Sequence, residues 1–127
     1  MLKYVELKSG FADNGPAWIA RVTVSKSGRT VYFNGRALKR TGRNGGRGNH
    51  WDLENGDEYW VSGVKKSGHD RHWAGSGLVN IEVSAVAEYL ALVDRADLDS
   101  ARFRVVPDLP ETDPARFAAL ENDRLSS

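Results

Sequence analysis

The sequence contains no cysteine. This absence excludes disulfide bonds, zinc and iron sites built on cysteine ligands, and catalysis by a thiol nucleophile. Any chemistry of the protein therefore has to come from oxygen and nitrogen groups. With 127 residues, the chain is long enough to form one domain around a single hydrophobic core.

Long apolar segments are also missing. The first ten residues, MLKYVELKSG, lack the apolar run of a signal peptide. No uncharged stretch reaches the roughly 18 residues that a membrane-spanning helix needs. We therefore expect a cytoplasmic protein that does not bind a membrane.

Acidic residues are absent from one long window of the chain. The 18 Lys and Arg residues nearly balance the 17 Asp and Glu residues, and the net charge is +1. Residues 1–80 nevertheless hold 13 basic and 7 acidic side chains, whereas residues 81–127 hold 5 basic and 10 acidic ones. Two interpretations stay open: a basic surface that binds a ligand, or a basic region that the acidic part neutralises. The basic residues between Asp13 and Asp52 are Arg21, Lys26, Arg29, Arg36, Lys39, Arg40, Arg43 and Arg47.

Turn signals at short intervals predict antiparallel hairpins. The turns are Lys26-Ser27-Gly28, Asn34-Gly35 and Asn55-Gly56. Asn-Gly is a strong hairpin signal because both residues tolerate the positive φ of a type I′ turn. A strand over residues 2–7 is a weaker prediction, because its apolar residues do not alternate cleanly. Alternation and turn positions together predict strands over residues 18–24, 30–33, 36–40, 50–53, 57–64 and 78–83, with Val79, Ile81 and Val83 on one side of the last.

The period of the apolar residues changes after Val83. Val86, Tyr89, Leu90 and Val93 have the spacing of an amphipathic helix, and Ser84 is the expected N-cap. Residues 103–106 could add an edge strand. Asp113 and Pro114 predict an N-cap followed by proline in the first turn of a short terminal helix.

These elements predict a mainly β (α+β) fold. We expect a small antiparallel open barrel or rolled sheet of five to six strands, SH3-like or OB-like, with one helix after the last core strand and a short C-terminal helix or tail. Residues 1–93 would form a single β-rich domain with its closing helix. Residues 94–127 would form an acidic, proline-containing extension, packed on that domain or partly mobile.

The most biased segment is Gly42-Arg43-Asn44-Gly45-Gly46-Arg47-Gly48, which predicts a mobile loop. It matches neither a P-loop nor a dinucleotide-binding fingerprint, and no cofactor is expected. Its arginines could follow a phosphate backbone, while Trp51, Tyr59, Trp60 and Trp73 offer ring faces for base stacking. The alternatives are a solvated connector and tryptophans that belong to the core.

A second polar segment runs from Lys65 to Gly77 and contains His69, Asp70 and His72. The two histidines could bind a metal together with Asp70 or His50, or one could act as a general base. We do not predict a metal site, because no third ligand stands at a recognisable interval. No nucleophile elbow or hydrolase signature is present either. As anion-binding groups, Lys65, Lys66 and Arg71 would extend the basic surface.

Two segments, GPAWIARVTVSKSGRTVYFNG and DEYWVSGVKKSGHDRHWAGSG, resemble a family of short bacterial proteins to which no activity is attached. The resemblance covers roughly the first 90 residues and implies a soluble, single-domain bacterial protein. No catalytic or binding residue is carried over from it, and the chain after Val93 lies outside it.

Three functions from different classes are compatible with these observations. The first is a small module that binds nucleic acid or another polyanion. The second is a protein-interaction or assembly module, including a homodimer, which uses an open sheet edge or the acidic extension. The third is a small hydrolase or lyase centred on His69, Asp70 and His72. The residues predicted to bind the polyanion are Arg36, Lys39, Arg40, Arg43, Arg47, Trp51, Lys65, Lys66, His69, Arg71, His72 and Trp73.

Overall fold

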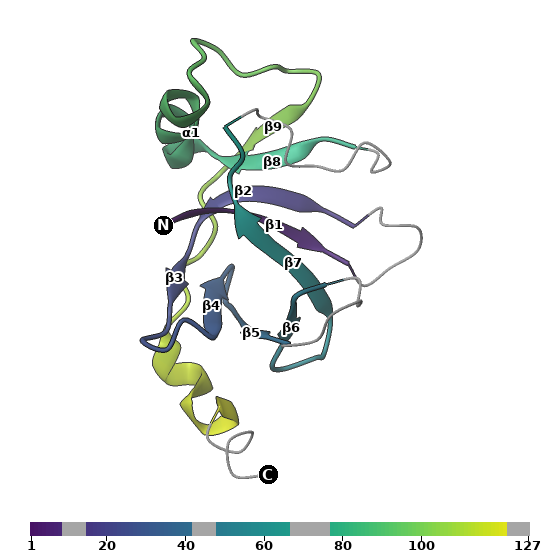
Figure 1. The fold of residues 1–127 in the computed structure, drawn as a ribbon, viewed down its shortest axis with the longest axis vertical. Helices are drawn as coiled ribbons and strands as arrows, with labels where there is room; N and C mark the ends of the chain where they lie inside the picture. Colours follow the sequence, from purple (N-terminus) through teal and green to yellow (C-terminus); the bar gives the residue numbers. More distant parts are fainter. Residues whose placement is uncertain (9–14, 42–47, 67–76, 122–127) are drawn as a thin grey trace.

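A computed structural model describes residues 1–8, 15–41, 48–66 and 77–121. Its nine strands form one sheet in the order β3-β4-β5-β6-β7-β1-β2-β8-β9, and the sheet curls into an open half-barrel (Figure 1). The strands are β1 (Leu2–Leu7), β2 (Ala17–Arg21), β3 (Thr23–Val24), β4 (Thr30–Phe33), β5 (Arg36–Arg40), β6 (His50–Asp52), β7 (Glu58–Gly63), β8 (Val79–Glu82) and β9 (Phe103–Val106). The helical elements are the 3₁₀ turn η2 (Val83–Ala85), the helix α1 (Val86–Val93) and the 3₁₀ turn η3 (Pro114–Phe117), which continues as a helix over residues 118–121.

The mainly β class is confirmed, but the predicted count of five to six strands is wrong. One reason is that the predicted strand over residues 18–24 is two strands, which separate at Val22. The backbone N–H of Val22 still donates to the carbonyl oxygen of Met1, at the end of the pairing with β1, whereas from Thr23 onward the chain pairs with β4. The weakly predicted β1 lies inside the sheet, between β7 and β2. Its apolar residues do not alternate because both faces are covered, so Tyr4 and Val5 are both buried.

The expectation of a wholly antiparallel sheet is wrong at one end. β8 pairs in parallel with β2, and β9 pairs in parallel with β8. Two parallel strands need a crossover connection, and η2 and α1 lie in the connection between β8 and β9. The edge strand predicted over residues 103–106 is confirmed as β9.

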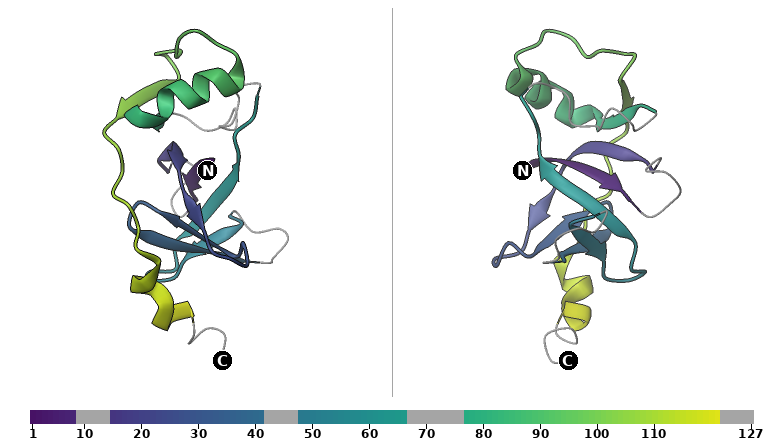
Figure 2. Two further views of the ribbon diagram at one scale, coloured as in Figure 1. Left: turned by 90° about the vertical axis from the view of Figure 1, so that its left-hand side faces the viewer. Right: turned by 45° about the vertical axis from the view of Figure 1, so that its right-hand side comes forward.

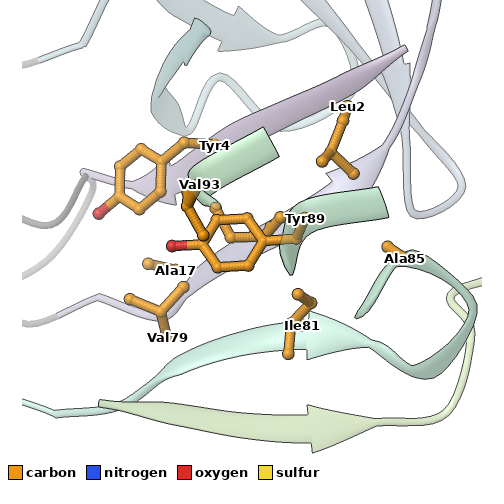
Figure 3. Close-up of a cluster of buried hydrophobic side chains, with 9 residues drawn as sticks. Leu2, Tyr4, Ala17, Val79, Ile81, Ala85, Tyr89 and Val93 are labelled. Atoms are coloured by element: carbon orange, nitrogen blue, oxygen red, sulfur yellow. The ribbon is translucent and has the colours of Figure 1, made fainter. Parts of the chain in front are cut away.

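The half-barrel buries apolar side chains on both faces of the sheet. We call the inner face the one that carries the cluster of Val5, Ala20, Val22, Val31, Phe33, Leu38, Tyr59 and Val61. The opposite, outer face carries two clusters under helical segments. One of them lies under α1 and contains Leu2, Tyr4, Ala17, Ile19, Val79, Ile81, Ala85, Tyr89 and Val93 (Figure 3).

Helix α1 confirms the predicted periodicity, since Tyr89 and Val93 are buried. Ser84 is not its N-cap: it lies inside η2, and the helix begins after Ala85 without a side-chain cap. Val83 is exposed rather than part of the core, because β8 ends at Glu82.

The described part of residues 94–127 is integrated into the fold. After β9 the chain crosses from one end of the half-barrel to the other (Figure 2), and Leu109 packs against the inner cluster on the way. Asp113 then caps η3 through a hydrogen bond from the backbone N–H of Ala115 at 3.0 Å, as predicted, and Pro114 follows it. Phe117 completes the second outer cluster with Tyr32, Ala37 and Leu53, so the C-terminal segment covers β4 and β5.

Candidate nucleic-acid interface

The structure describes half of the residues predicted to bind a polyanion. Those that lie in described segments are Arg36, Lys39, Arg40, Trp51, Lys65 and Lys66. Those that lie outside the described residues are Arg43, Arg47, His69, Arg71, His72 and Trp73. The possible catalytic or metal-binding group of His69, Asp70 and His72 is therefore also outside them.

The basic residues of β5 do not share one face of the sheet. Cross-strand partners in an antiparallel pair lie on the same face, and successive residues alternate. Arg36 and Arg40 lie on the inner face with Leu38. Lys39 lies on the outer face, opposite Trp51 of β6.

Arg36 is engaged inside the protein. Its Nη1 donates to Oδ2 of Asp52 at 2.7 Å, and the Asp52 side chain is 0% exposed. This hydrogen bond is the main cause that raises the pKa of Arg36. The other carboxylate oxygen of Asp52 accepts the backbone N–H of Glu54 at 2.8 Å, so the pair holds β5 against β6 and the turn that follows. Arg36 therefore has a structural role, and its contact with a polyanion stays a prediction.

Three further cations have carboxylate partners: Lys8 with Glu6, Arg21 with Glu88, and Arg116 with Glu54. The described cations that make no ion pair with any described residue are Lys3, Lys26, Arg29, Lys39, Arg40, Lys66, Arg95, Arg102 and Arg104.

Four of these unpaired cations gather at one end of β4 and β5. The turn that carries Lys26 and Arg29 folds beside the end of β5, because the backbone N–H of Arg40 donates to the carbonyl oxygen of Arg29 at 2.8 Å. Lys26, Arg29 and Arg40 are exposed, and Lys39 is half-buried. We call these four residues the basic end. Segment 42–47, with two further arginines, follows directly in the sequence.

Two tryptophans stand next to the basic end on the outer face. Trp51 is half-buried against the cluster of Phe117, and its cross-strand partners are Lys39 and Glu58. Trp60, two residues after Glu58 on β7, lies on the same face and is 40% exposed. Side chains at such diagonal positions are close enough for aromatic rings to share one surface. We call Lys39, Trp51 and Trp60 the outer strip.

The sequence offers Trp60 as a ring for base stacking, but Trp60 is not among the residues predicted to bind the polyanion. The local signal for it is the alternation of β7, in which Tyr59 and Val61 are buried while Glu58 and Trp60 are exposed. Tyr59, the other aromatic considered for stacking, belongs to the inner cluster and offers no ring face to a ligand.

His50 lies on the inner face, opposite Arg40 and Tyr59. Its Nδ1 makes a 2.8 Å hydrogen bond with Oδ1 of Asn49. Burial, followed by the positive charges of Arg40 and Lys3, lowers the pKa of His50 from 6.5 to about 4. His50 is therefore neutral near pH 7. The described residues, which include His50 but not His69, Asp70 or His72, contain no group of three or more possible metal ligands.

A polar pocket of about 530 Å³ lies where the C-terminal segment crosses the ends of β2, β3 and β8. Two carboxylates in it hold the crossing segment. Glu82 is buried, which raises its pKa, and it accepts the backbone N–H groups of Arg21 and Leu109. Asp108 accepts the backbone N–H of Ser84 at 3.0 Å, which lowers its pKa. These contacts explain the carboxylates without a ligand.

Comparison of the chain with known protein families, curated proteins and solved structures found no match. In the described ranges of the chain, the helices are too short or too polar to cross a bilayer. The candidate interface therefore has to be judged on its own residues.

Proposed function

We propose that this protein binds nucleic acid or another polyanion through the outer strip and the basic end. The observation that supports it most is the cross-strand pairing of Lys39 with Trp51, with the 40% exposed Trp60 beside it. Figure 2 shows α1 over one end of the sheet and the C-terminal helical segment at the other. The outer strip lies on β5, β6 and β7, and these strands come between β4 and β1 in the order of the sheet.

Single-stranded nucleic acid fits this surface best. Bases stack on exposed aromatic rings at roughly 1–3 kcal/mol per base, and unpaired cations attract the phosphates. Lys39 and the basic end would contact the backbone, while Trp60 and the edge of Trp51 would contact bases. Glu58 is an acidic side chain on the same face, which favours a path for the phosphates on the Lys39 side.

The SH3-like or OB-like type remains part of this proposal. Small open barrels of that kind often bind oligonucleotides on a sheet face. Barrel type alone does not imply function, so the argument rests on the placement of Lys39, Trp51 and Trp60.

Fluorescence anisotropy with a labelled single-stranded oligonucleotide and its duplex, at low and physiological salt, tests the proposal. We expect saturable binding of the single strand that weakens steeply with salt. Trp60→Ala and Lys39→Gln should each weaken it, Trp60→Ala by about tenfold. Arg95→Gln is the control, because it removes one exposed positive charge just after α1. No binding at low salt, or equal binding by all variants, would refute the proposal.

A second function is favoured by the free edge of β9. β9 is the last strand of the sheet, and among the described strands it pairs with β8 alone. The side chain of Val105, in β9, is 50% exposed. Such an edge can pair with a strand of another chain. A dimer that persists in high salt and is lost in Val105→Lys would favour an assembly module. The hydrolase or lyase centred on His69, Asp70 and His72 stays a prediction.

A further inference from the structure

A second group of basic side chains lies on the inner face. Arg40 and His50 are directly opposite each other on β5 and β6. Lys3 of β1 lies on the same face, opposite Gly63 of β7. A side chain at Gly63 would meet no atom within 4 Å, so the inner face is open beside Lys3. Lys3 and Arg40 have no carboxylate partner among the described residues.

The hydrogen bonds of Asn49 determine which nitrogen of His50 carries the proton. Oδ1 of Asn49 accepts the backbone N–H of Val61 at 2.8 Å, and its amide nitrogen donates to the carbonyl oxygen of Val61 at 2.8 Å. Asn49 is thereby fixed as an acceptor toward His50, so Nδ1 of His50 must donate to it. In the neutral ring, Nε2 is then an acceptor. Nε2 has no hydrogen-bond partner in the part of the chain that the structure describes, although His50 is only 7% exposed.

Two positive charges come close enough to affect His50. Arg40 on β5 and Lys3 on β1 both act on the ring. The next ionic groups along β5 and β6, Arg36 and Asp52, are paired with each other at 2.7 Å. Arg40 and Lys3 would therefore attract an anion. Nε2 of the neutral imidazole would still be a hydrogen-bond acceptor without a donor.

We propose that Lys3, Arg40 and His50 form a binding site for an oxyanion that carries its own proton, namely hydrogen phosphate or a terminal phosphomonoester. The site deepens the proposed function, because it names a phosphate group that the protein recognises, but it uses no residue of the outer strip. Phosphate oxygens accept hydrogen bonds from Arg40 and Lys3, and the phosphate O–H donates to Nε2 of His50.

This chemistry distinguishes protonated phosphates from other anions. Sulfate and internal phosphodiesters carry no O–H near neutral pH. Arg40 and Lys3 would still attract them, but Nε2 of His50 would stay without a donor unless His50 first took up a proton, so they would bind more weakly. A phosphomonoester near pH 6 keeps its second proton about half of the time. The site should therefore prefer phosphate to sulfate near pH 6, and the preference should shrink as the pH falls toward 4.

Imidazole NMR of the full chain tests this site, with the His50 signals assigned by comparison with His50→Gln. At pH 6, inorganic phosphate should shift the His50 signals saturably and bind about tenfold more tightly than sulfate. Lys3→Gln and Arg40→Gln should each weaken phosphate binding about tenfold. Arg95→Gln is the control, because it removes one exposed positive charge just after α1, on the opposite side of the sheet, and it should leave phosphate binding unchanged.

Oligonucleotides with and without a 5′-phosphate separate the two sources of the phosphate group. If the His50 signals shift with inorganic phosphate but not with the 5′-phosphorylated strand, the site binds free phosphate. If they shift with the 5′-phosphorylated strand but not with the 5′-hydroxyl strand, the site binds the phosphorylated end of a nucleic acid. Unshifted His50 signals with both ligands, or equal affinity for phosphate and sulfate, would overturn the inference. In that event the proposed function would still stand if the 5′-hydroxyl strand bound in a Trp60-dependent manner, so the two failures are distinguishable.

Discussion

The ring of Phe117 fixes the C-terminal helical segment to the outer face of β4 and β5. It is 1% exposed and packs with Tyr32, Ala37 and Leu53. We predict that Phe117→Ala lowers the free energy of unfolding by more than a substitution at any exposed position of the same segment does. The prediction follows mainly from burial, and the ring has one further contact, with the guanidinium of Arg116 at 4.9 Å from the ring centroid.

The expected cost can be derived from the contacts of the segment. Truncating a buried phenylalanine to alanine destabilises proteins by about 3–5 kcal/mol. We expect a value near the lower limit, about 3 kcal/mol, because η3 is a short element that can shift to fill part of the cavity. The polar contacts of the neighbouring Arg116 add little to the free energy of unfolding. Arg116 donates to the carbonyl oxygen of Gly35 at 3.0 Å and pairs with Glu54 at 3.2 Å, but both partners of this ion pair are exposed.

Urea unfolding followed by circular dichroism measures the loss, with Arg116→Ala as the control in the same segment. Phe117→Ala should lower the midpoint strongly with an unchanged slope, and Arg116→Ala should cost less than about 1 kcal/mol. A loss below about 1 kcal/mol for Phe117→Ala would refute the reasoning, since it would mean that the segment does not contribute to the core.

Three further predictions follow from single contacts. Asp52→Asn should destabilise the fold by about 2 kcal/mol in urea unfolding, because it weakens a buried charged hydrogen bond, but it should not change oligonucleotide affinity in the anisotropy assay. Gly48→Ala should lower the melting temperature by several degrees, since its Cβ would lie 2.5 Å from a backbone oxygen of β7, whereas Gly63→Ala should raise or keep it. The pKa of His50 is about 4 in the folded protein and about 6.5 in the unfolded chain, so on acidification the unfolded chain binds a proton first. The free energy of unfolding should therefore decrease as the pH falls from 6.5 to 4, by up to about 3 kcal/mol. In His50→Gln this part of the pH dependence of the unfolding free energy should disappear.

Local features of the chain were predictable where neighbouring residues decide the backbone. Asn34 and Gly35 both have positive φ, 51° and 73°, as a type I′ turn requires. The helical spacing of Tyr89 and Val93 gave α1, and the N-cap at Asp113 is present. These signals act over a few residues, so they do not depend on the rest of the fold.

Long-range pairing was not predictable in the same way. The parallel partners of β8 come from segments far away in the sequence, and hairpin signals report only on sequential neighbours. Ser84 failed as a cap because the chain first makes a 3₁₀ turn there. The alternation in β1 was obscured because both faces of that strand are covered.

The sequence by itself determined that the chain is cysteine-free, mainly β, and rich in positive charge before Asp52. Only the tertiary structure decided what each of those charges does. Arg36, Lys39 and Arg40 are close in the sequence, yet the first pairs with Asp52, the second lies beside Trp51, and the third lies beside His50. The physical reason is that alternation assigns side chains to two faces, whereas the curl of the sheet and the returning C-terminal segment decide which face is covered and which cation meets a carboxylate.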